Sequence, residues 1–243
     1  MTLACIEPEW PASSRIKAFT TTRTGGVSVA PYDCLNLAEH VGDDLEDVTH
    51  NRKVLSEHLA LPQTPQWLNQ QHTLDIQTDT VCFGGRPCDG SYTQQTGRVC
   101  VVMTADCMPI FITDTAGTQV SVVHAGWRGL AGGIVEKAIQ LFNAPVQELL
   151  VWAGPTISQA NFEIGAEVKQ ALGGSDCFYQ ANANKPGHYF ADLYGLAGER
   201  MAALGVSFYG HSSLCTYADE ERLFSYRRAA VTGRMASLIW MEM

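Results

Sequence analysis

The sequence lacks a long apolar run, a leader-like segment and a dense basic segment. Nowhere do eighteen apolar residues follow one another, and the N-terminal MTLACIEPEWPASSR has no basic stretch before an apolar one, which argues against a membrane span and a signal peptide. The chain has 16 Lys and Arg against 25 Asp and Glu, a formal net charge of −9, and this charge repels a phosphate backbone. We therefore expect a cytoplasmic protein that binds neither membranes nor nucleic acid.

Paired cysteines are also missing. The eight cysteines include no Cys-x-x-Cys pair, which argues against a zinc ribbon and a thioredoxin motif. A reducing compartment argues against disulfides, and a free cysteine behaves as a small apolar residue. Most of them are therefore expected to be buried thiols; they stand at positions 5, 34, 82, 88, 100, 107, 177 and 215.

Nucleotide-binding signatures, repeats and linkers are absent as well. Without a G-x-G-x-x-G, a P-loop or a Pro/Ser-rich boundary, we expect one domain over residues 1–243 that is not a Rossmann fold. Helices and strands are interspersed without strict βαβ alternation, which predicts an α/β fold of the mixed α+β type, with layered mixed β-sheets flanked by helices. Helices are predicted at 43–60, at 130–142 and from Asp192 to Leu204, and strands at 99–103, 109–113, 119–123, 149–153, 206–209 and 237–241.

The sequence does contain a cysteine and a histidine at the two ends of a predicted hairpin, ADCMPIFITDTAGTQVSVVHAGWRG, residues 105–129. If its strands pair around a four-residue turn at 114–117, Cys107 lies directly opposite His124. Directly opposed residues share one face, with Cβ atoms about 4.5–5.5 Å apart. The hairpin therefore predicts that the thiol and the imidazole form one site.

Two chemistries use such a pair. Cys107 can be a nucleophile with His124 as its base, or both can bind a borderline-soft ion such as Zn²⁺, which requires a third ligand. His72 in WLNQQHT can supply that ligand and leave a fourth position open for water. Spacing alone leaves both alternatives open, because 35 residues separate His72 from Cys107.

Five motifs carry a resemblance to a known family: WLNQQH, VVMTADCMPI, SVVHAGWRG, GPTI with NFEIG, and LFSYRR with TGRMAS. They resemble the YfiH family, long labelled multicopper polyphenol oxidases or laccase-like proteins, from TTRTGGVS near residue 21 to the C-terminus. The resemblance implies that His72, Cys107 and His124 hold one zinc ion. It also implies a layered α/β fold similar to the deamidase domain of cytotoxic necrotizing factor.

The resemblance implies an activity as well. Family members cleave adenosine, inosine, guanosine and methylthioadenosine with phosphate, which yields a base and a ribose 1-phosphate, and they deaminate adenosine to inosine. Purine nucleosides and phosphate are therefore the expected partners. Gln71 and Thr73 stand where valine and glycine are common, and CDGSYT (88–93) stands where A-D-A usually begins. These departures bear on loop conformation and substrate preference and leave the three ligands intact.

Catalytic and phosphate-binding residues are less well defined by the sequence. Zinc-bound water could attack C6 of adenosine, but the H-x-E of cytidine-type deaminases is missing. We therefore add Asp106 and Glu163 as candidate proton carriers to Cys107 and His124, although each could equally be an orienting or surface group.

For phosphate we consider Arg23 in TTRTGG, Arg128 in GWRG, and Arg227 in a cluster with Arg228 and Arg234, with an ion-paired surface position as the alternative for each. The remaining histidines are expected to be structural or exposed; they are His40, His50, His58, His188 and His211.

An oxidase function finds less support in the sequence. The seven histidines include no His-x-His pair, and Met108, which beside a His₂Cys set resembles a blue-copper ligand, points away from Cys107 in an extended strand. Copper can still bind in vitro, because Cu²⁺ outcompetes Zn²⁺ at most N/S sites. We predict a zinc-dependent purine nucleoside enzyme. The alternatives are a metal-free Cys107–His124 amidase or deamidase acting on cell-wall precursors, a copper-dependent polyphenol oxidase, and a non-catalytic binding protein.

Overall fold

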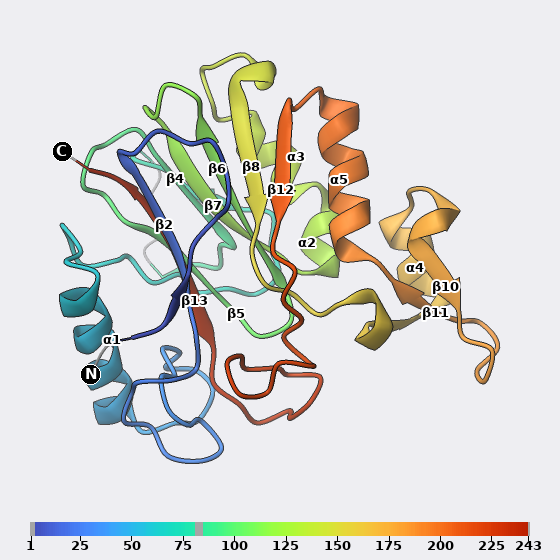
Figure 1. Cartoon of the computed structure of the whole chain (residues 1–243), viewed down its shortest axis with the longest axis horizontal. Coiled ribbons are helices and arrows are strands. Elements are labelled where there is room, and N and C mark those ends of the chain that lie inside the picture. Colours follow the sequence, from blue (N-terminus) through green and yellow to red (C-terminus); the bar gives the residue numbers. More distant parts are fainter. Residues whose placement is uncertain (1–2, 81–84, 243) are drawn as a thin grey trace.

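The computed structural model describes residues 3–80 and 85–242, and its helices and sheets form four layers (Figure 1). The first sheet is antiparallel, with the strand order β1-β2-β13-β5. Helix α1 (Leu45–His58) covers its outer face, where Leu55 joins one apolar cluster with Leu238 and Trp240. The strands are β1 (Cys5–Ile6), β2 (Ile16–Thr21), β13 (Met235–Met241) and β5 (Cys100–Thr104).

The second sheet has six strands in the order β12-β8-β6-β7-β4-β3. The outer pairs, β12 with β8 and β3 with β4, are parallel, and the inner pairs are antiparallel. Its inner face packs on the first sheet, with Phe111 and Trp152 in one cluster with Ile239. The strands are β12 (Phe208–His211), β8 (Leu149–Ala153), β6 (Met108–Asp114), β7 (Val120–Ala125), β4 (Gly90–Thr93) and β3 (Ile76–Gln77).

Helices cover the other face of the six-stranded sheet (Figure 1). Ile134 and Leu196 on these helices join Ile110 and Ile112 of β6 in the largest apolar cluster. Because the central sheet is covered on both faces, β6 and β8 are continuously buried rather than alternating. These helices are α2 (Trp127–Gly132), α3 (Ile134–Ile139) and α5 (Leu193–Leu204), and α4 (Ala166–Leu172) packs on α2.

The remaining elements are short. An antiparallel sheet, β10-β11-β9, lies beside α4. Its strands are β9 (Glu163–Gly165), β10 (Tyr179–Ala181) and β11 (His188–Ala191), and 3-10 turns cover Val146–Glu148, Gln159–Asn161 and Asp176–Phe178. None of the helices in the described residues is long and apolar enough to cross a membrane.

The predicted layered α/β architecture is confirmed, with corrections to its elements. The helices predicted at 43–60 and from Asp192 are α1 and α5, and all six predicted strands are present. The helix predicted at 130–142 is instead two helices, because Gly133 takes a left-handed φ of 88° that an unbroken helix does not allow. The sequence predictions also lack α4 and seven strands, most of which are too short to give a periodic pattern; these strands are β1, β2, β3, β4, β9, β10 and β11.

The predicted hairpin register is wrong by two residues. Met108 pairs with Ala125 and Pro109 with His124, so Cys107 lies just before β6 and diagonal to His124. The turn is longer than four residues because the Asp114 carboxylate accepts hydrogen bonds from the N–H groups of Thr118, at 2.7 Å, and of residue 119, at 3.2 Å. A shift of two residues preserves the side-chain alternation, so Cys107 and His124 still lie on one face.

The cysteines are less buried than predicted. The seven described ones are free thiols, but of these just Cys88 and Cys100 are fully buried, and Cys177 is exposed. Cys82 lies outside the described residues. Loops and sheet edges, where several of these cysteines lie, are less covered than the strand centres that the apolar character of cysteine favours.

Candidate metal and substrate site

His72, Cys107 and His124 come together at one end of the layered sheets. Each offers one ligand atom, and these atoms lie within 4.8 Å of one another. Ligands of one Zn²⁺, at about 2.0–2.3 Å from the ion, lie roughly 3.3–3.8 Å apart, so small side-chain movements would close the three donors on a cation. The donor set of two imidazoles and a thiolate suits a borderline-soft ion. In residues 3–80 and 85–242 no other group of three such side chains is close enough to hold a metal.

The Asp89 carboxylate orients His124. The Asp89 Oδ1 atom lies 2.7 Å from Nδ1 of His124, so Nδ1–H donates to the carboxylate and Nε2 is left for a ligand. Asp89 is fully buried, and a buried carboxylate needs such partners. Burial by itself raises the pKa of Asp89, but the hydrogen bond and the charge of His124, with the backbone N–H groups of Thr73 and Gln71, hold it below its usual range.

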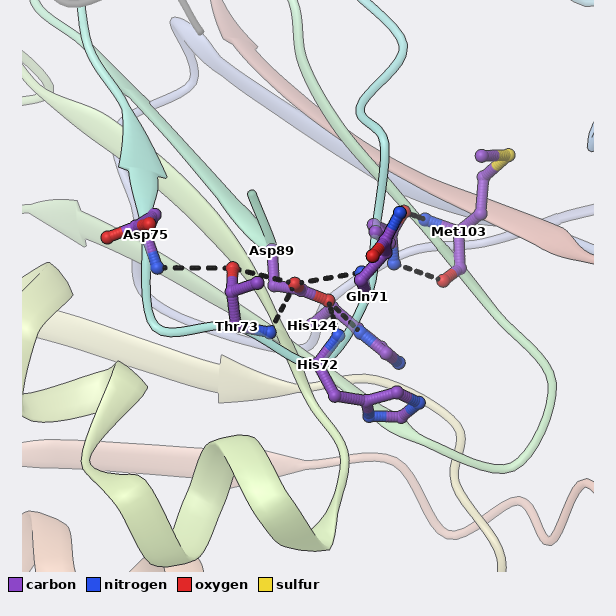
Figure 2. Close-up of polar contacts among 8 residues, drawn as sticks. Gln71, His72, Thr73, Asp75, Asp89, Met103 and His124 are labelled. Carbon is purple, nitrogen blue, oxygen red and sulfur yellow. Dashed lines mark hydrogen bonds and ion pairs between the residues drawn. The ribbon is translucent and has the colours of Figure 1, made fainter. Parts of the chain in front are cut away.

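The same carboxylate fixes the loop that carries His72. It accepts hydrogen bonds from the backbone N–H groups of Gln71 at 3.1 Å, His72 at 3.0 Å and Thr73 at 2.6 Å, and from the Thr73 hydroxyl at 2.9 Å. Figure 2 shows Asp89 between this loop and His124. His72 has a left-handed φ of 58°, which the three N–H contacts stabilise. One buried side chain therefore positions two of the three ligands, and the sequence reading missed it although Asp89 belongs to the CDGSYT segment.

Gln70 attaches this loop to the first sheet. Its amide donates to the carbonyl oxygen of Met103 at 2.8 Å and accepts from the N–H of Met103 at 2.7 Å. The side chain thus pairs with β5 as a neighbouring strand would. Since β5 leads directly to Cys107, Gln70 sets the distance between the segments of His72 and Cys107.

Gly126 allows the ligands to approach one another. A Cβ atom at this position would lie 2.7 Å from Sγ of Cys107 and 3.0 Å from Nδ1 of His72. Both contacts are shorter than van der Waals distance. Gly126 in SVVHAGWRG is therefore required, because any side chain at this position would collide with Cys107 and His72.

The charges of Cys107 and Asp89 act on His124. Burial lowers the pKa of His124, but the Cys107 thiolate and the hydrogen bond to Asp89 outweigh it and raise the pKa to about 9. Burial and the neighbouring His124 lower the pKa of His72. A cation bound here would replace the proton of His124, because a metal-bound imidazole must be neutral.

A cavity of about 350 Å³ opens over the three side chains. Aromatic rings of Trp127, Phe162 and Tyr226 line it together with His40 and Gln70. A cavity of this size and mixed lining suits a small organic ligand. His40, expected to be structural or exposed, is exposed, and it also lines this cavity.

The two candidate proton carriers lie in different places. Asp106 lines the cavity, and its carboxylate accepts hydrogen bonds from the Thr216 hydroxyl and from the N–H of Arg227, each at 2.6 Å. Glu163 is not part of the lining; its carboxylate lies 2.7 Å from Nζ of Lys185 and 2.9 Å from Nδ1 of His188. The structure thus brings Asp106, and not Glu163, to the three ligands.

The candidate phosphate residues are also divided. Arg128 and Arg227 line the cavity, and so does Arg234. Arg23 does not: its guanidinium lies 3.1 Å from the Asp33 carboxylate and donates to the Glu220 carbonyl oxygen. The sequence reading could not separate these arginines, since the separation depends on loop paths that bring residues 226–234 back to the cavity.

Met108 contributes nothing to the cavity. Its side chain is fully buried in the largest apolar cluster, on the other side of the strand from Cys107. The expectation from strand alternation is confirmed, and a copper site with a methionine ligand finds no support in this geometry.

Comparison with known proteins shows the family to which the chain belongs. The sequence profile described as "Multi-copper polyphenol oxidoreductase laccase" matches residues 17–242. A Shigella flexneri protein named Purine nucleoside phosphorylase YfiH is 44% identical, over 97% of this chain and 98% of that protein. The chain belongs to this family. We refer to it below as the YfiH family.

Other YfiH-family relatives agree with this assignment. A Pseudomonas aeruginosa protein that also carries the name purine nucleoside phosphorylase is 42% identical, over 98% of this chain and 99% of its own length. The crystal structure of a Neisseria meningitidis protein superposes with a TM-score of 0.91 at 38% identity, covering 98% of this chain and 99% of that one. YlmD from Geobacillus stearothermophilus gives a TM-score of 0.89 at 31% identity, with 98% and 96% coverage. The predicted family and fold are thus confirmed.

Proposed function

We propose that this YfiH-family protein is a zinc-dependent enzyme of purine nucleosides, which cleaves adenosine, inosine, guanosine or methylthioadenosine with phosphate and deaminates adenosine to inosine. The observation that carries the proposal is the group formed by His72, Cys107 and His124 at the base of an aromatic and arginine-lined cavity. The names of the relatives support the phosphorylase activity.

The cavity offers separate surfaces for the parts of such substrates. Trp127, Phe162 and Tyr226 can pack on a purine ring, which is flat and apolar on its faces. Arg128 and Arg227 can receive the phosphate charge. A nucleoside and a phosphate would both lie beside the metal-ligand group, which places the reacting atoms near each other.

In phosphorolysis an oxygen of hydrogen phosphate forms the new bond to C1′ while the C1′–N9 bond breaks, and the departing base takes up the proton that the hydrogen phosphate loses. The arginines hold the phosphate in line with that bond and exclude competing water by filling the wall. Asp106 accepts hydrogen bonds from Thr216 and from the N–H of Arg227, and it thereby fixes the loop that carries Tyr226 and Arg227. Asp106 therefore contributes to the reaction by positioning Tyr226 and Arg227.

Bound zinc would supply Lewis-acid activation at neutral pH, and the same site would then serve deamination at C6. The chain's own contribution is the orientation of the ligands by Asp89 and the enclosure of the substrate. Copper can bind the same donors in vitro.

A metal-free amidase remains the second candidate, because Cys107 and His124 are close enough for a nucleophile and a base. It leaves His72, and the five hydrogen bonds that Asp89 accepts at this site, without a role. A multicopper oxidase needs several metal centres, and the described residues offer a single group of three ligands.

The test is chromatography of adenosine incubated with the purified protein, with and without phosphate. We expect adenine to form only with phosphate and inosine to form without it, and the His72→Ala variant to lose both products. Unchanged adenosine with zinc-loaded protein would contradict the proposal. Full activity of His72→Ala alongside an inactive Cys107→Ser would favour the amidase.

A further inference from the structure

The cavity wall is positively charged although the chain is acidic. Three arginines line it, Arg128, Arg227 and Arg234, on a chain whose formal net charge is −9. The single carboxylate in the lining belongs to Asp106, and both of its oxygens accept hydrogen bonds, from Thr216 and from the N–H of Arg227. Since three guanidinium groups face one carboxylate, the wall keeps an excess of cationic charge.

These three arginines differ from most others in the part of the chain that the structure describes. Within residues 3–80 and 85–242, none of the three has a carboxylate oxygen within 4.0 Å, whereas six other arginines each have one, namely Arg23, Arg52, Arg98, Arg200, Arg222 and Arg228. Unpaired guanidinium groups that gather in one cavity indicate an anionic ligand.

Arg234 is the most firmly held of the three. Its Nη1 atom donates to the carbonyl oxygens of Thr232 at 2.8 Å and Gly233 at 3.0 Å, and its backbone N–H donates to the buried Asn36 side chain at 3.0 Å. Within the described residues its Nε and Nη2 atoms make no hydrogen bond. A half-buried guanidinium with two free donors is costly unless an anion fills the space in front of it.

Arg234 and Arg128 line the same cavity as His72, Cys107 and His124. Although burial lowers the pKa of Arg234, the negative charges of Cys107 and Asp106 act against that effect. The charge of Arg128 contributes to the lowered pKa of His72. Arg128 is exposed at the cavity and stacks on the neighbouring Trp127 ring at 4.3 Å.

Arg227 is already engaged. Its Nη1 atom donates to the carbonyl oxygen of Glu163 at 3.1 Å, and its guanidinium lies 5.5 Å from the centre of the Phe162 ring. Like Arg234, it keeps Nε and Nη2 without a hydrogen bond within the described residues, but its side chain is exposed whereas that of Arg234 is half-buried, which makes it the weaker anchor for an anion.

We propose that Arg234 and Arg128 form the subsite for the phosphate co-substrate, with Arg234 as its anchor and Arg128 closing it from the solvent side; this rests on the nucleoside function proposed above. A guanidinium offers two parallel N–H donors that match two oxygens of a phosphate. The sequence placed Arg234 only in a cluster with Arg227 and Arg228. In this proposal Arg234 has the phosphate-binding role that was predicted for Arg23.

Calorimetric titration of the zinc-loaded protein with inorganic phosphate tests the subsite without turnover. We expect Arg234→Gln to weaken phosphate binding by at least about tenfold and Arg128→Gln to weaken it less, since a charge-assisted pair contributes more when it is buried. Arg234→Lys should be intermediate because it keeps the charge but not the two parallel donors. The matched control is Arg15→Gln, since the Arg15 side chain donates only to the Glu242 carbonyl oxygen at the surface.

Steady-state kinetics provide the second readout. Arg234→Gln should raise the KM for phosphate and leave both the KM for the nucleoside and the zinc content unchanged. Wild-type phosphate affinity in Arg234→Gln, or no phosphate binding by the wild-type protein with or without adenine, overturns the subsite. If Arg234→Gln does not fold, wild-type phosphate affinity in Arg128→Gln overturns it. If phosphate binds through Arg234 but no nucleoside is cleaved, the subsite stands and the proposed function fails.

Discussion

Asp89 shows how much of the site depends on one residue that binds no substrate. It accepts hydrogen bonds from His124 and from three consecutive N–H groups of the loop at 71–73. A neutral amide has one acceptor oxygen, and its NH₂ group would face those donors. Both the direction of the His124 ring and the unusual backbone of His72 thus depend on the charge of this carboxylate.

We therefore expect Asp89→Asn to lower zinc affinity by about 10–100-fold while the protein still folds. Competition with a chromophoric chelator measures the affinity. Asp75→Asn, an exposed carboxylate in the same loop, is the control and should bind zinc like the wild-type protein. Equal affinity of Asp89→Asn and the wild type would contradict the positioning role.

Thiol reactivity should differ between cysteines in a predictable order. Burial and Glu7 raise the pKa of Cys5 to about 11. Burial also acts on Cys215, but hydrogen bonds from Ser158 and from backbone N–H groups outweigh it and lower the pKa of that thiol. A lower pKa means a larger thiolate fraction at any pH below it, and the thiolate is the reactive form.

Iodoacetamide at pH 8 should therefore modify Cys215 before Cys5, and the rate at Cys215 should level off at a lower pH. Peptide mass spectrometry over a pH series follows both sites in one sample. A higher rate at Cys5 throughout the series would show that access, rather than thiolate fraction, decides the order.

At the scale of elements, capping residues that can be recognised in the sequence determine where two of the helices begin or end. Asp44 caps α1 through a hydrogen bond from the N–H of Glu46 to its side chain at 2.8 Å. Gly205 ends α5 in a left-handed conformation. These local interactions do not depend on the rest of the fold, which explains why the predicted limits of both helices are nearly correct.

Asp44→Ala should lower the free energy of unfolding by about 0.5–2 kcal/mol, the usual contribution of an N-cap. Urea denaturation measures it. Asp44→Asn keeps an acceptor oxygen at the cap and should stay close to the wild type. An equal loss in both variants would show that the charge near the helix N-terminus, and not the hydrogen bond, provides the stabilisation.

At the scale of the whole molecule, the metal-ligand group joins separate parts of the fold. His72 lies in a loop that Asp89 fixes, Cys107 lies between β5 and β6, and His124 lies in β7. Because β5 belongs to the first sheet and β7 to the second, an ion bound to all three residues would link the two sheets.

Removal of zinc should therefore lower the Tm of the protein. A ligand at 100 times its Kd stabilises the folded state by about 2.7 kcal/mol, which is a shift of several degrees for a chain of this size. Differential scanning calorimetry with and without a chelator measures it. His72→Ala should show the same Tm in both conditions, and a chelator effect of wild-type size in that variant would contradict the assigned ligands.

The sequence by itself determined the family, the layered α/β class and the residues of the metal-ligand group. Apolar runs, helix caps and short motifs are local features, so they can be recognised without knowledge of the tertiary contacts. The face shared by Cys107 and His124 was predictable even though the register was not, because side-chain direction depends only on whether the shift is even or odd.

The tertiary structure alone decided which polar and charged groups line the cavity or orient the residues of the candidate metal site. Asp89, Arg234 and His40 lie far from the ligands in sequence, and Glu163 and Arg23 sit in motifs that look equally functional. Their places depend on how loops return across the ends of two packed sheets, and loop paths are set by long-range packing and buried hydrogen bonds. The balance of charge in the cavity is therefore a property of the assembled fold.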